Sequence, residues 1–221
     1  MSSRVSSSSS STAYHQAEDF RERSQDALAS TSTLVNPDPP VSYIFDRNSV
    51  IGATLYTRSG PAYKIITNRE VSRTELCDLT DRNIVATLKR RDFLPNLVVF
   101  AHRNGKPLKI SNWLKRRKIS QGNQMATVYD LLTPSGCFTW KSDGTRNLAL
   151  YPQYQTDFPI AYSKKLEDPP TLALFLRSCS DNDKVEIITS FIVLEHRLRM
   201  KEKILEGNTL YGVGSQFIMM R

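Results

Sequence analysis

The chain has 221 residues, enough for one domain with a sizeable core and flanking segments, and 39% hydrophobic against 24% charged residues is the balance of a folded soluble protein. Its net charge of +8 indicates an anionic partner, or no more than a route to solubility. The N-terminus has no apolar run of the signal-peptide kind, and the acids Glu18, Asp19 and Glu22 argue against a transit peptide, so we do not expect secretion.

Residues 1–40 begin with a serine run and end in NPDPP. They hold too few large apolar residues to build a core, so the sequence predicts a disordered leader. From residue 41 the pattern changes to short apolar segments separated by turn-forming residues.

These segments predict about twelve short antiparallel strands, as in a sandwich or barrel. The predicted strands are 43–46, 53–57, 62–67, 72–78, 84–90, 97–101, 107–111, 127–132, 137–141, 147–151, 159–163 and 171–177. No internal period is present, which disfavours a repeat array.

One helix is expected, at 183–206. Asp183 and Glu186 form a plausible capping pair at its start, and Gly207 with Asn208 supplies a stop. The run from Ile187 to Leu194 is uncharged on every side, although eight residues rise only about 12 Å, too little to span a bilayer. A helix that is apolar all round is then buried in protein.

Together these elements predict a mainly β fold with one central helix: an antiparallel barrel of about twelve strands that encloses the hydrophobic C-terminal helix. A helix between two sheets would satisfy the same pattern. The expected domain is 41–206, followed by a tail at 207–221. From Glu195 onward the helix becomes charged, and we interpret this part as the exit from the barrel, with Glu195 and Arg199 paired on a wet face.

The order of several segments resembles a family of domains of unknown function abundant in basidiomycete fungi. The segments are TLYTRSGPAYKIIT, SNWLKR, FTWK, NLALY, PIAYS, TLALFL and VEIITSFIVLEHRLRMKEK, within residues 42–203. That family is grouped with the tubby C-terminal-like fold, alongside LURP-one-related and phospholipid scramblase proteins. The resemblance implies a twelve-stranded barrel around a hydrophobic C-terminal helix. It also implies binding of phosphoinositide head groups through surface Lys and Arg, with no residue-by-residue assignment.

The residues offer little catalytic chemistry. The sequence contains no HExxH, Walker loop, G-x-S-x-G or zinc pattern, so no metal or cofactor is expected. Cys77, Cys137 and Cys179 are an odd number without a CxxC, typical of reduced thiols in the cytosol or nucleus. A Cys77–His102 nucleophile and base is the enzyme alternative, which requires the two side chains to meet.

Charge is the one marked asymmetry. Between Arg82 and Tyr129 there are eleven Lys and Arg residues against a single acid, Asp92. Ordinary surfaces intersperse the two signs. The predicted anion-binding residues are Lys89, Arg90, Arg91, Arg103, Lys106, Lys109, Lys115, Arg116, Arg117 and Lys118.

The basic block suggests several partners. An anionic membrane lipid is attracted to clustered bases, as is an acidic protein. Nucleic acid binds through its phosphates, but the block lacks interleaved aromatic residues. KRR (89–91) and KRRK (115–118) could address the protein to the nucleus. We therefore expect a non-enzymatic cytoplasmic binding module, peripheral to a membrane or nuclear, with a nucleic-acid-associated protein and a cysteine-dependent enzyme as alternatives.

Overall fold

The computed structural model describes residues 40–216 apart from 122–123, 143–146, 155–157 and 178, so the predicted leader lies almost wholly outside the described residues. The protein is mainly β, as predicted, with thirteen strands in one antiparallel sheet. The strands are β1 (Val41–Phe45), β2 (Thr54–Thr57), β3 (Gly60–Thr67), β4 (Arg73–Asp78), β5 (Asn83–Lys89), β6 (Leu97–Phe100), β7 (Pro107–Lys109), β8 (Leu114–Gln121), β9 (Gln124–Thr133), β10 (Gly136–Ser142), β11 (Leu148–Pro152), β12 (Ala161–Glu167) and β13 (Pro170–Leu176).

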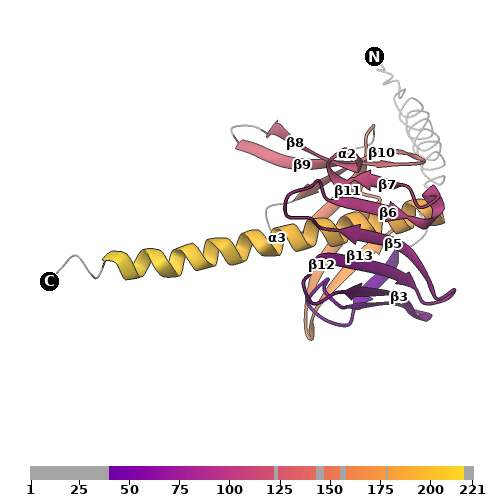
Figure 1. Ribbon diagram of the computed structural model, residues 1–221, viewed down its shortest axis with the longest axis horizontal. Helices are drawn as coiled ribbons and strands as arrows, with labels where there is room; N and C mark the ends of the chain where they lie inside the picture. Colours follow the sequence, from indigo (N-terminus) through magenta and orange to yellow (C-terminus); the bar gives the residue numbers. More distant parts are fainter. Residues whose placement is uncertain (1–39, 122–123, 143–146, 155–157, 178, 217–221) are drawn as a thin grey trace, which may run out of the picture. The chain divides into compact units, whose positions relative to one another are not determined.

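The sheet consists of two meanders joined at its middle. Strands β1 to β7 follow one another to one edge, strands β13 to β8 follow one another to the other edge, and β1 pairs with β13. The helices are η1 (Ala101–Arg103), α2 (Ile110–Trp113) and α3 (Asp181–Gln216). The sheet curls around the first half of α3 (Figure 1).

Every predicted strand is present within a few residues of its predicted bounds, and one strand was missed. The missed strand is β8, LKRRKISQ, which carries the KRRK sequence. Its side chains at 115–118 are all exposed, so the strand shows none of the apolar alternation by which a half-buried strand is recognised.

The predicted closed barrel is wrong. Within the described residues no ladder joins the two edge strands, β7 and β8, although they are neighbours in the chain. The single turn α2 lies between them instead and buries Trp113. The chain passes from one edge to the other through α2 without forming a ladder, so the sheet stays open along a seam between β7 and β8.

The start of α3 is capped three residues earlier than predicted. The backbone N–H of Asp183 donates to Ser180 Oγ at 3.2 Å, which makes Ser180 the N-cap, and the Ser180 hydroxyl donates to Asp183 Oδ2 at 2.6 Å. Asp183 is therefore at position N3 of the helix rather than at the N-cap, and Glu186 takes no part in capping. The predicted end at 206 is also wrong, because α3 continues through Gly207 and Asn208 to Gln216. Such residues disfavour a helix by only about 1 kcal/mol each, which does not compel it to end.

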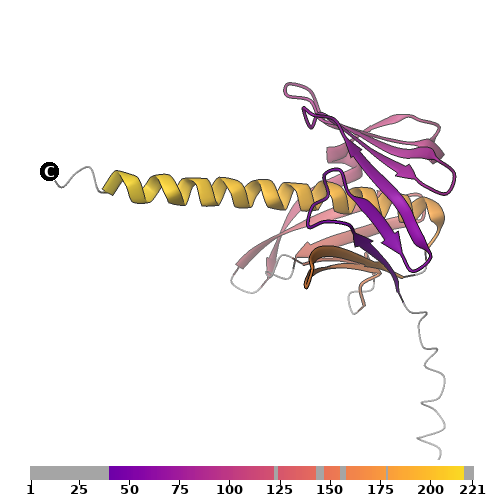
Figure 2. The same ribbon diagram turned by 90° about the horizontal axis from the view of Figure 1, so that it is seen from below.

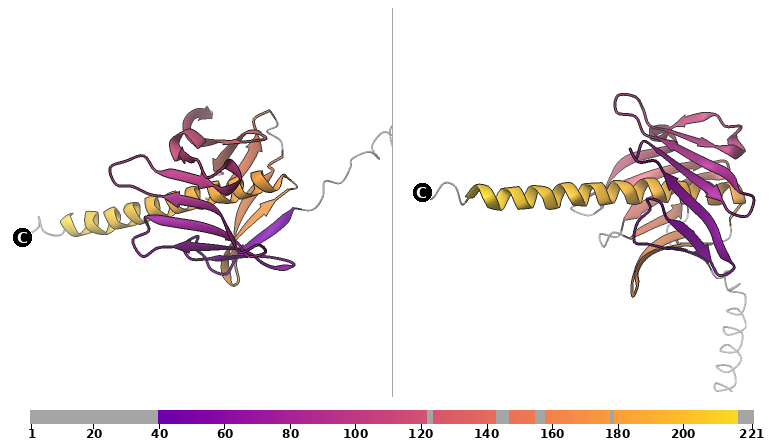
Figure 3. Two further views of the ribbon diagram at one scale, coloured as in Figure 1. Left: turned by 45° about the vertical axis from the view of Figure 1, so that its right-hand side comes forward. Right: turned by 60° about the horizontal axis from the view of Figure 1, so that its bottom comes forward.

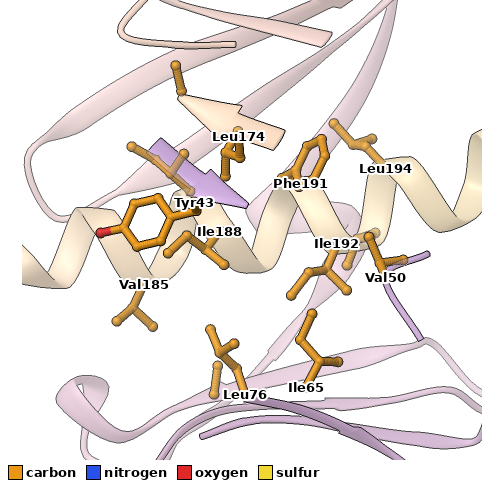
Figure 4. Packing of buried hydrophobic residues seen from close by; sticks show 14 of the residues in the cluster. Tyr43, Val50, Ile65, Leu76, Leu174, Val185, Ile188, Phe191, Ile192 and Leu194 are labelled. Atoms are coloured by element: carbon orange, nitrogen blue, oxygen red, sulfur yellow. The ribbon is translucent and has the colours of Figure 1, made fainter. Parts of the chain in front are cut away.

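The first half of α3 is the centre of the core, as its uncharged sequence predicted. Phe191 is fully buried, and its ring centroid lies 5.9 Å from that of Phe45 and 6.2 Å from that of Trp140. Figure 4 shows Phe191 among the other buried side chains of the helix, such as Ile188 and Leu194. The polar residues of this part are satisfied locally: Thr189 Oγ1 donates to Val185 O at 2.7 Å, and Ser190 Oγ accepts from Trp140 Nε1 at 2.8 Å. The helix can therefore be buried without unsatisfied hydroxyls.

The second half of α3 leaves the sheet and extends beyond it (Figures 2 and 3). The predicted pair of Glu195 and Arg199 is present at 2.8 Å, but Glu195 is only 2% exposed, so the pair is not on a wet face. Arg199 also donates to Asn48 O at 2.6 Å, which ties the β1–β2 loop to the helix. The side chain of Leu205 lies outside the described residues. Among those described, no helix combines the length and apolar character that crossing a bilayer requires.

Candidate functional site

The candidate site lies where α3 emerges from the sheet. Here the hairpin of β8 and β9 extends on the same side as the outgoing helix (Figures 1 and 2). The guanidinium of Arg197 lies 6.0 Å from the ring centroid of Tyr129, on β9, so the helix and the hairpin are in contact. This contact is a cation–π interaction.

The register of the hairpin separates the KRRK charges onto two faces. Arg116 lies opposite Tyr129 and Lys118 opposite Thr127. Residues directly opposite each other in an antiparallel pair share a face. Arg116 and Lys118 thus share the face that meets Arg197, and Lys115 and Arg117 are on the other face.

Two pockets adjoin Arg197. The larger, of about 240 Å³, has an apolar wall that includes Trp140, Leu148 and Leu194, and the cationic residues Arg197 and Lys201 line it too. The smaller, of about 160 Å³, is lined by Arg90, His196 and Arg197 among others. We call Arg90, Arg116, Lys118, Arg197 and Lys201 the exit cluster.

The positive charge at this end of the domain also acts on His196. Burial, together with the charges of Arg90, Lys203 and Arg197, lowers the pKa of His196 to about 4. The pKa of Arg90 is lowered too, by burial first and then by Arg197. Between about pH 6.5, the pKa of an unfolded histidine, and pH 4, the unfolded chain takes up a proton at His196 and the folded protein does not. The free energy of unfolding therefore decreases as the pH falls through this range.

Arg90 also has a structural role. It is half-buried and donates from Nη1 to Val71 O at 2.8 Å. Val71 has φ +56°, a left-handed conformation that is unusual for a β-branched residue. Because Arg90 holds this turn, its substitution would disturb the fold as well as the pocket.

Arg103 is engaged in a different place, at the seam between β7 and β8. Its Nε and Nη2 donate to the two carboxylate oxygens of Glu186 at 2.7 and 2.9 Å, and Nη2 also donates to Leu132 O at 3.1 Å. Glu186 is fully buried and further bonded by His102 Nε2 and Trp113 Nε1, at 2.8 and 2.9 Å. The charge of Arg103 is thus neutralised internally, and the Glu186 cluster bridges the open seam.

The remaining predicted residues are dispersed. Arg117 pairs with Asp130 at 2.8 Å, which raises the pKa of the guanidinium, and the hydrogen bond from Arg117 lowers the pKa of Asp130. The other five are exposed side chains at the end of β5, on β7 or in the turn before it, or on the outward face of β8: Lys89, Arg91, Lys106, Lys109 and Lys115. The block that is continuous in sequence is therefore distributed over several surfaces.

Residues 47–200 match a family of unknown function, DUF6593. The chain belongs to this family. The match covers more than half of the 221 residues, from the loop after β1 to the charged part of α3. No curated protein and no solved structure matches the chain.

The DUF6593 match includes most of the exit cluster. Arg90, Arg116, Lys118 and Arg197 lie within the matched residues, and Lys201 follows directly after them. Sequence reasoning missed Arg197 and Lys201 because it took the charged part of α3 for a solvated exit. The signal available was the spacing of four residues, which puts both on one side of a helix.

The thiols and histidines of the DUF6593 domain bear on the enzyme alternative. Burial raises the pKa of Cys77, with Glu75 adding to the effect, so this thiol resists becoming a nucleophilic thiolate. His102 directs Nε2 to Glu186 rather than to a thiol. Burial also raises the pKa values of Cys137 and Cys179. In the part of the chain that the structure describes, no group of His, Cys, Asp and Glu could hold a metal ion.

Proposed function

We propose that this DUF6593 domain is a non-enzymatic module that binds an anionic lipid through the exit cluster. The observation that carries the proposal is the pocket of about 240 Å³ that joins an apolar wall to Arg197 and Lys201. An amphipathic anion has the matching chemistry, an apolar chain next to a negative head group. A partner that was only an anion would have no use for the wall formed by Trp140 and Leu194.

Three segments contribute cations to this end of the domain. Arg116 and Lys118 come from β8, Arg90 follows β5, and Arg197 comes from α3. Each base close to an anionic bilayer adds about 1 kcal/mol of attraction. Five such groups would recruit the domain to a membrane surface without a membrane-spanning segment. In this proposal the protein is cytoplasmic and membrane-peripheral, and its sheet around a central helix is a relative of the tubby-type fold.

A structural explanation competes for part of the cluster. β8 is an edge strand, and Lys or Arg on an edge prevents another strand from pairing with it. Under this explanation, loss of the β8 charges causes self-association and leaves lipid binding unchanged. The explanation does not extend to Arg197 and Lys201, which lie on the helix.

Vesicle flotation tests the proposal. Vesicles of phosphatidylcholine alone are compared with vesicles that also contain phosphatidylserine or a phosphoinositide. Each is tested at low salt and at about 0.5 M salt, where the Debye length is only about 4 Å and attraction between exposed charges is screened. We expect recruitment to the anionic vesicles only, weaker at high salt. No recruitment would contradict the proposal, as would equal recruitment to neutral vesicles. A salt-sensitive shift of duplex DNA without vesicle binding would favour the nucleic-acid alternative.

Matched variants locate the surface. Arg197→Gln with Lys201→Gln should abolish most recruitment, because both cations of the larger pocket are lost. Lys106→Gln with Lys109→Gln removes the same charge from exposed positions elsewhere and should leave recruitment close to wild type. Equal loss in the two double variants would mean that net charge, not the pocket, is responsible.

A further inference from the structure

A third pocket, larger than the two beside Arg197, lies at the other end of the buried part of α3. Its volume is about 480 Å³, and its walls come from β1, β3 and the loops after β2 and β4, together with the first turn of the helix. Asp181 and Arg197 are separated by about 24 Å along the helix axis, so this pocket is distinct from the exit cluster. We call it the N-terminal pocket.

Two tyrosines with buried rings line the N-terminal pocket. Tyr43 is 4% and Tyr63 is 7% exposed, and their ring centroids are 6.0 Å apart. Among the described residues neither hydroxyl makes a hydrogen bond. In Figure 4 the Tyr43 hydroxyl points past Val185, toward the start of α3 and away from Phe191. The rings of both tyrosines are buried, and their hydroxyls are open to the pocket, where a ligand could reach them.

The charges around the pocket define the sign of that ligand. Asp78, Asp81 and Asp181 line it against a single ammonium, that of Lys184, which already pairs with Asp181 at 2.5 Å. His102 lines the pocket as well, but its Nε2 is bonded to Glu186. Asp78 Oδ1 accepts a hydrogen bond from the Thr80 backbone N–H at 2.8 Å. Within the described part of the chain neither Asp78 nor Asp81 forms an ion pair, so these two carboxylates carry the uncompensated charge.

Both tyrosines of the N-terminal pocket remain neutral phenols at neutral pH. Burial raises the pKa of Tyr63, and the charges of Asp78 and Asp181 raise it further. Burial raises the pKa of Tyr43 in the same way, against a lowering effect of Lys184. Each neutral phenol oxygen can accept a hydrogen bond from an N–H donor.

We infer that the N-terminal pocket binds a small organic cation with primary ammonium groups, of the aliphatic polyamine class. Its N–H groups would donate to the Tyr43 and Tyr63 oxygens and pair with Asp78 and Asp81. An anion is the natural ligand of a helix N-terminus, where the partial charge is about +0.5. Here it would meet two uncompensated carboxylates, so the local charge favours the cation.

Isothermal titration calorimetry of the full chain with spermidine and putrescine tests the inference. We expect saturable binding, and no binding of 1,4-butanediol, which has the length of putrescine without its charge. Asp78→Asn and Tyr63→Phe should each weaken binding about tenfold or more, since each loses a hydrogen bond to a charged group. Succinate binding in place of the amines would overturn the inference.

Control variants separate the pocket from general effects. Tyr56→Phe alters a tyrosine that is 43% exposed and does not line the pocket, and Asp92→Asn removes an exposed acid elsewhere. Both should bind spermidine like the wild type. Tyr63→Phe removes one oxygen only, and an unchanged thermal midpoint will show that it remains folded. Equal weakening in all variants, or none in any, would overturn the inference. Flotation on anionic vesicles should be unaffected by Tyr63→Phe, so the two proposals fail separately.

Discussion

The Glu186 cluster allows a sharp prediction about stability. Glu186 is fully buried, and its two carboxylate oxygens accept four hydrogen bonds, from His102, Arg103 twice and Trp113. The substitution Glu186→Gln retains the shape of the side chain and one acceptor oxygen. It replaces the other oxygen with an NH₂ group that faces donors.

The magnitude follows from the groups left without a partner. Each carboxylate oxygen of Glu186 accepts two of the four hydrogen bonds, so replacing one oxygen with NH₂ leaves two donors without an acceptor. An unsatisfied buried donor costs about 1–3 kcal/mol. Arg103 also loses its counter-charge, although its side chain is 28% exposed, so solvent screens part of that loss. We expect Glu186→Gln to lower the free energy of unfolding by about 3 kcal/mol, or the thermal midpoint by about 10 °C.

Urea unfolding followed by tryptophan fluorescence measures this loss, since Trp113 is itself a partner of Glu186. Glu70→Gln removes an exposed carboxylate from the turn between β3 and β4 and should change stability by less than about 1 kcal/mol. A loss for Glu186→Gln below about 0.5 kcal/mol would refute the view that the buried carboxylate bridges the open seam. In the double variant Glu186→Gln with Arg103→Gln, part of the stability lost in Glu186→Gln should be restored, because no cation is left without its partner.

Three other predictions concern α3. Phe191→Asp buries an unpaired charge among Phe45 and Trp140 and should unfold the domain, at a cost of several kcal/mol; a folded variant by circular dichroism would refute the central-helix account. His196→Asn should reduce the loss of stability between pH 7 and pH 5 by about 1 kcal/mol after allowance for solvent screening, because the wild-type pKa of about 4 resists protonation; parallel pH profiles would contradict this. Ser180→Ala removes the N-cap hydroxyl and should cost about 1 kcal/mol in urea unfolding, whereas no change would show that the helix start needs no cap.

The strands and the buried helix could be predicted because their signals are local. Alternation in segments such as VSYIF and the uncharged run from Ile187 to Leu194 reflect burial directly. β8 could not be predicted in this way, because LKRRKISQ pairs with β9 through backbone groups while its charged side chains stay in solvent. Backbone pairing leaves no mark on the side-chain pattern.

The candidate site was predicted only in part, because it depends on register and on distant contacts. The basic block identified Arg90, Arg116 and Lys118, but also residues that the fold disperses or neutralises. Arg103 is an example: its partner Glu186 is 83 positions away in sequence. The same holds for the open seam, since the sequence of α2 does not reveal that ISNW forms a helical turn.

The central claim is that a base on β8 contributes to membrane recruitment only if it lies on the face that meets Arg197, here called the inward face. Membership of the basic block in sequence is not sufficient. Flotation on anionic vesicles of two double variants tests it: Arg116→Glu with Lys118→Glu on the inward face, and Lys115→Glu with Arg117→Glu on the outward face. The two variants have the same composition and the same net charge, and they alter the same strand. The account predicts that the inward variant loses recruitment and the outward variant retains it. Equal recruitment of the two, or a loss confined to the outward variant, would contradict it.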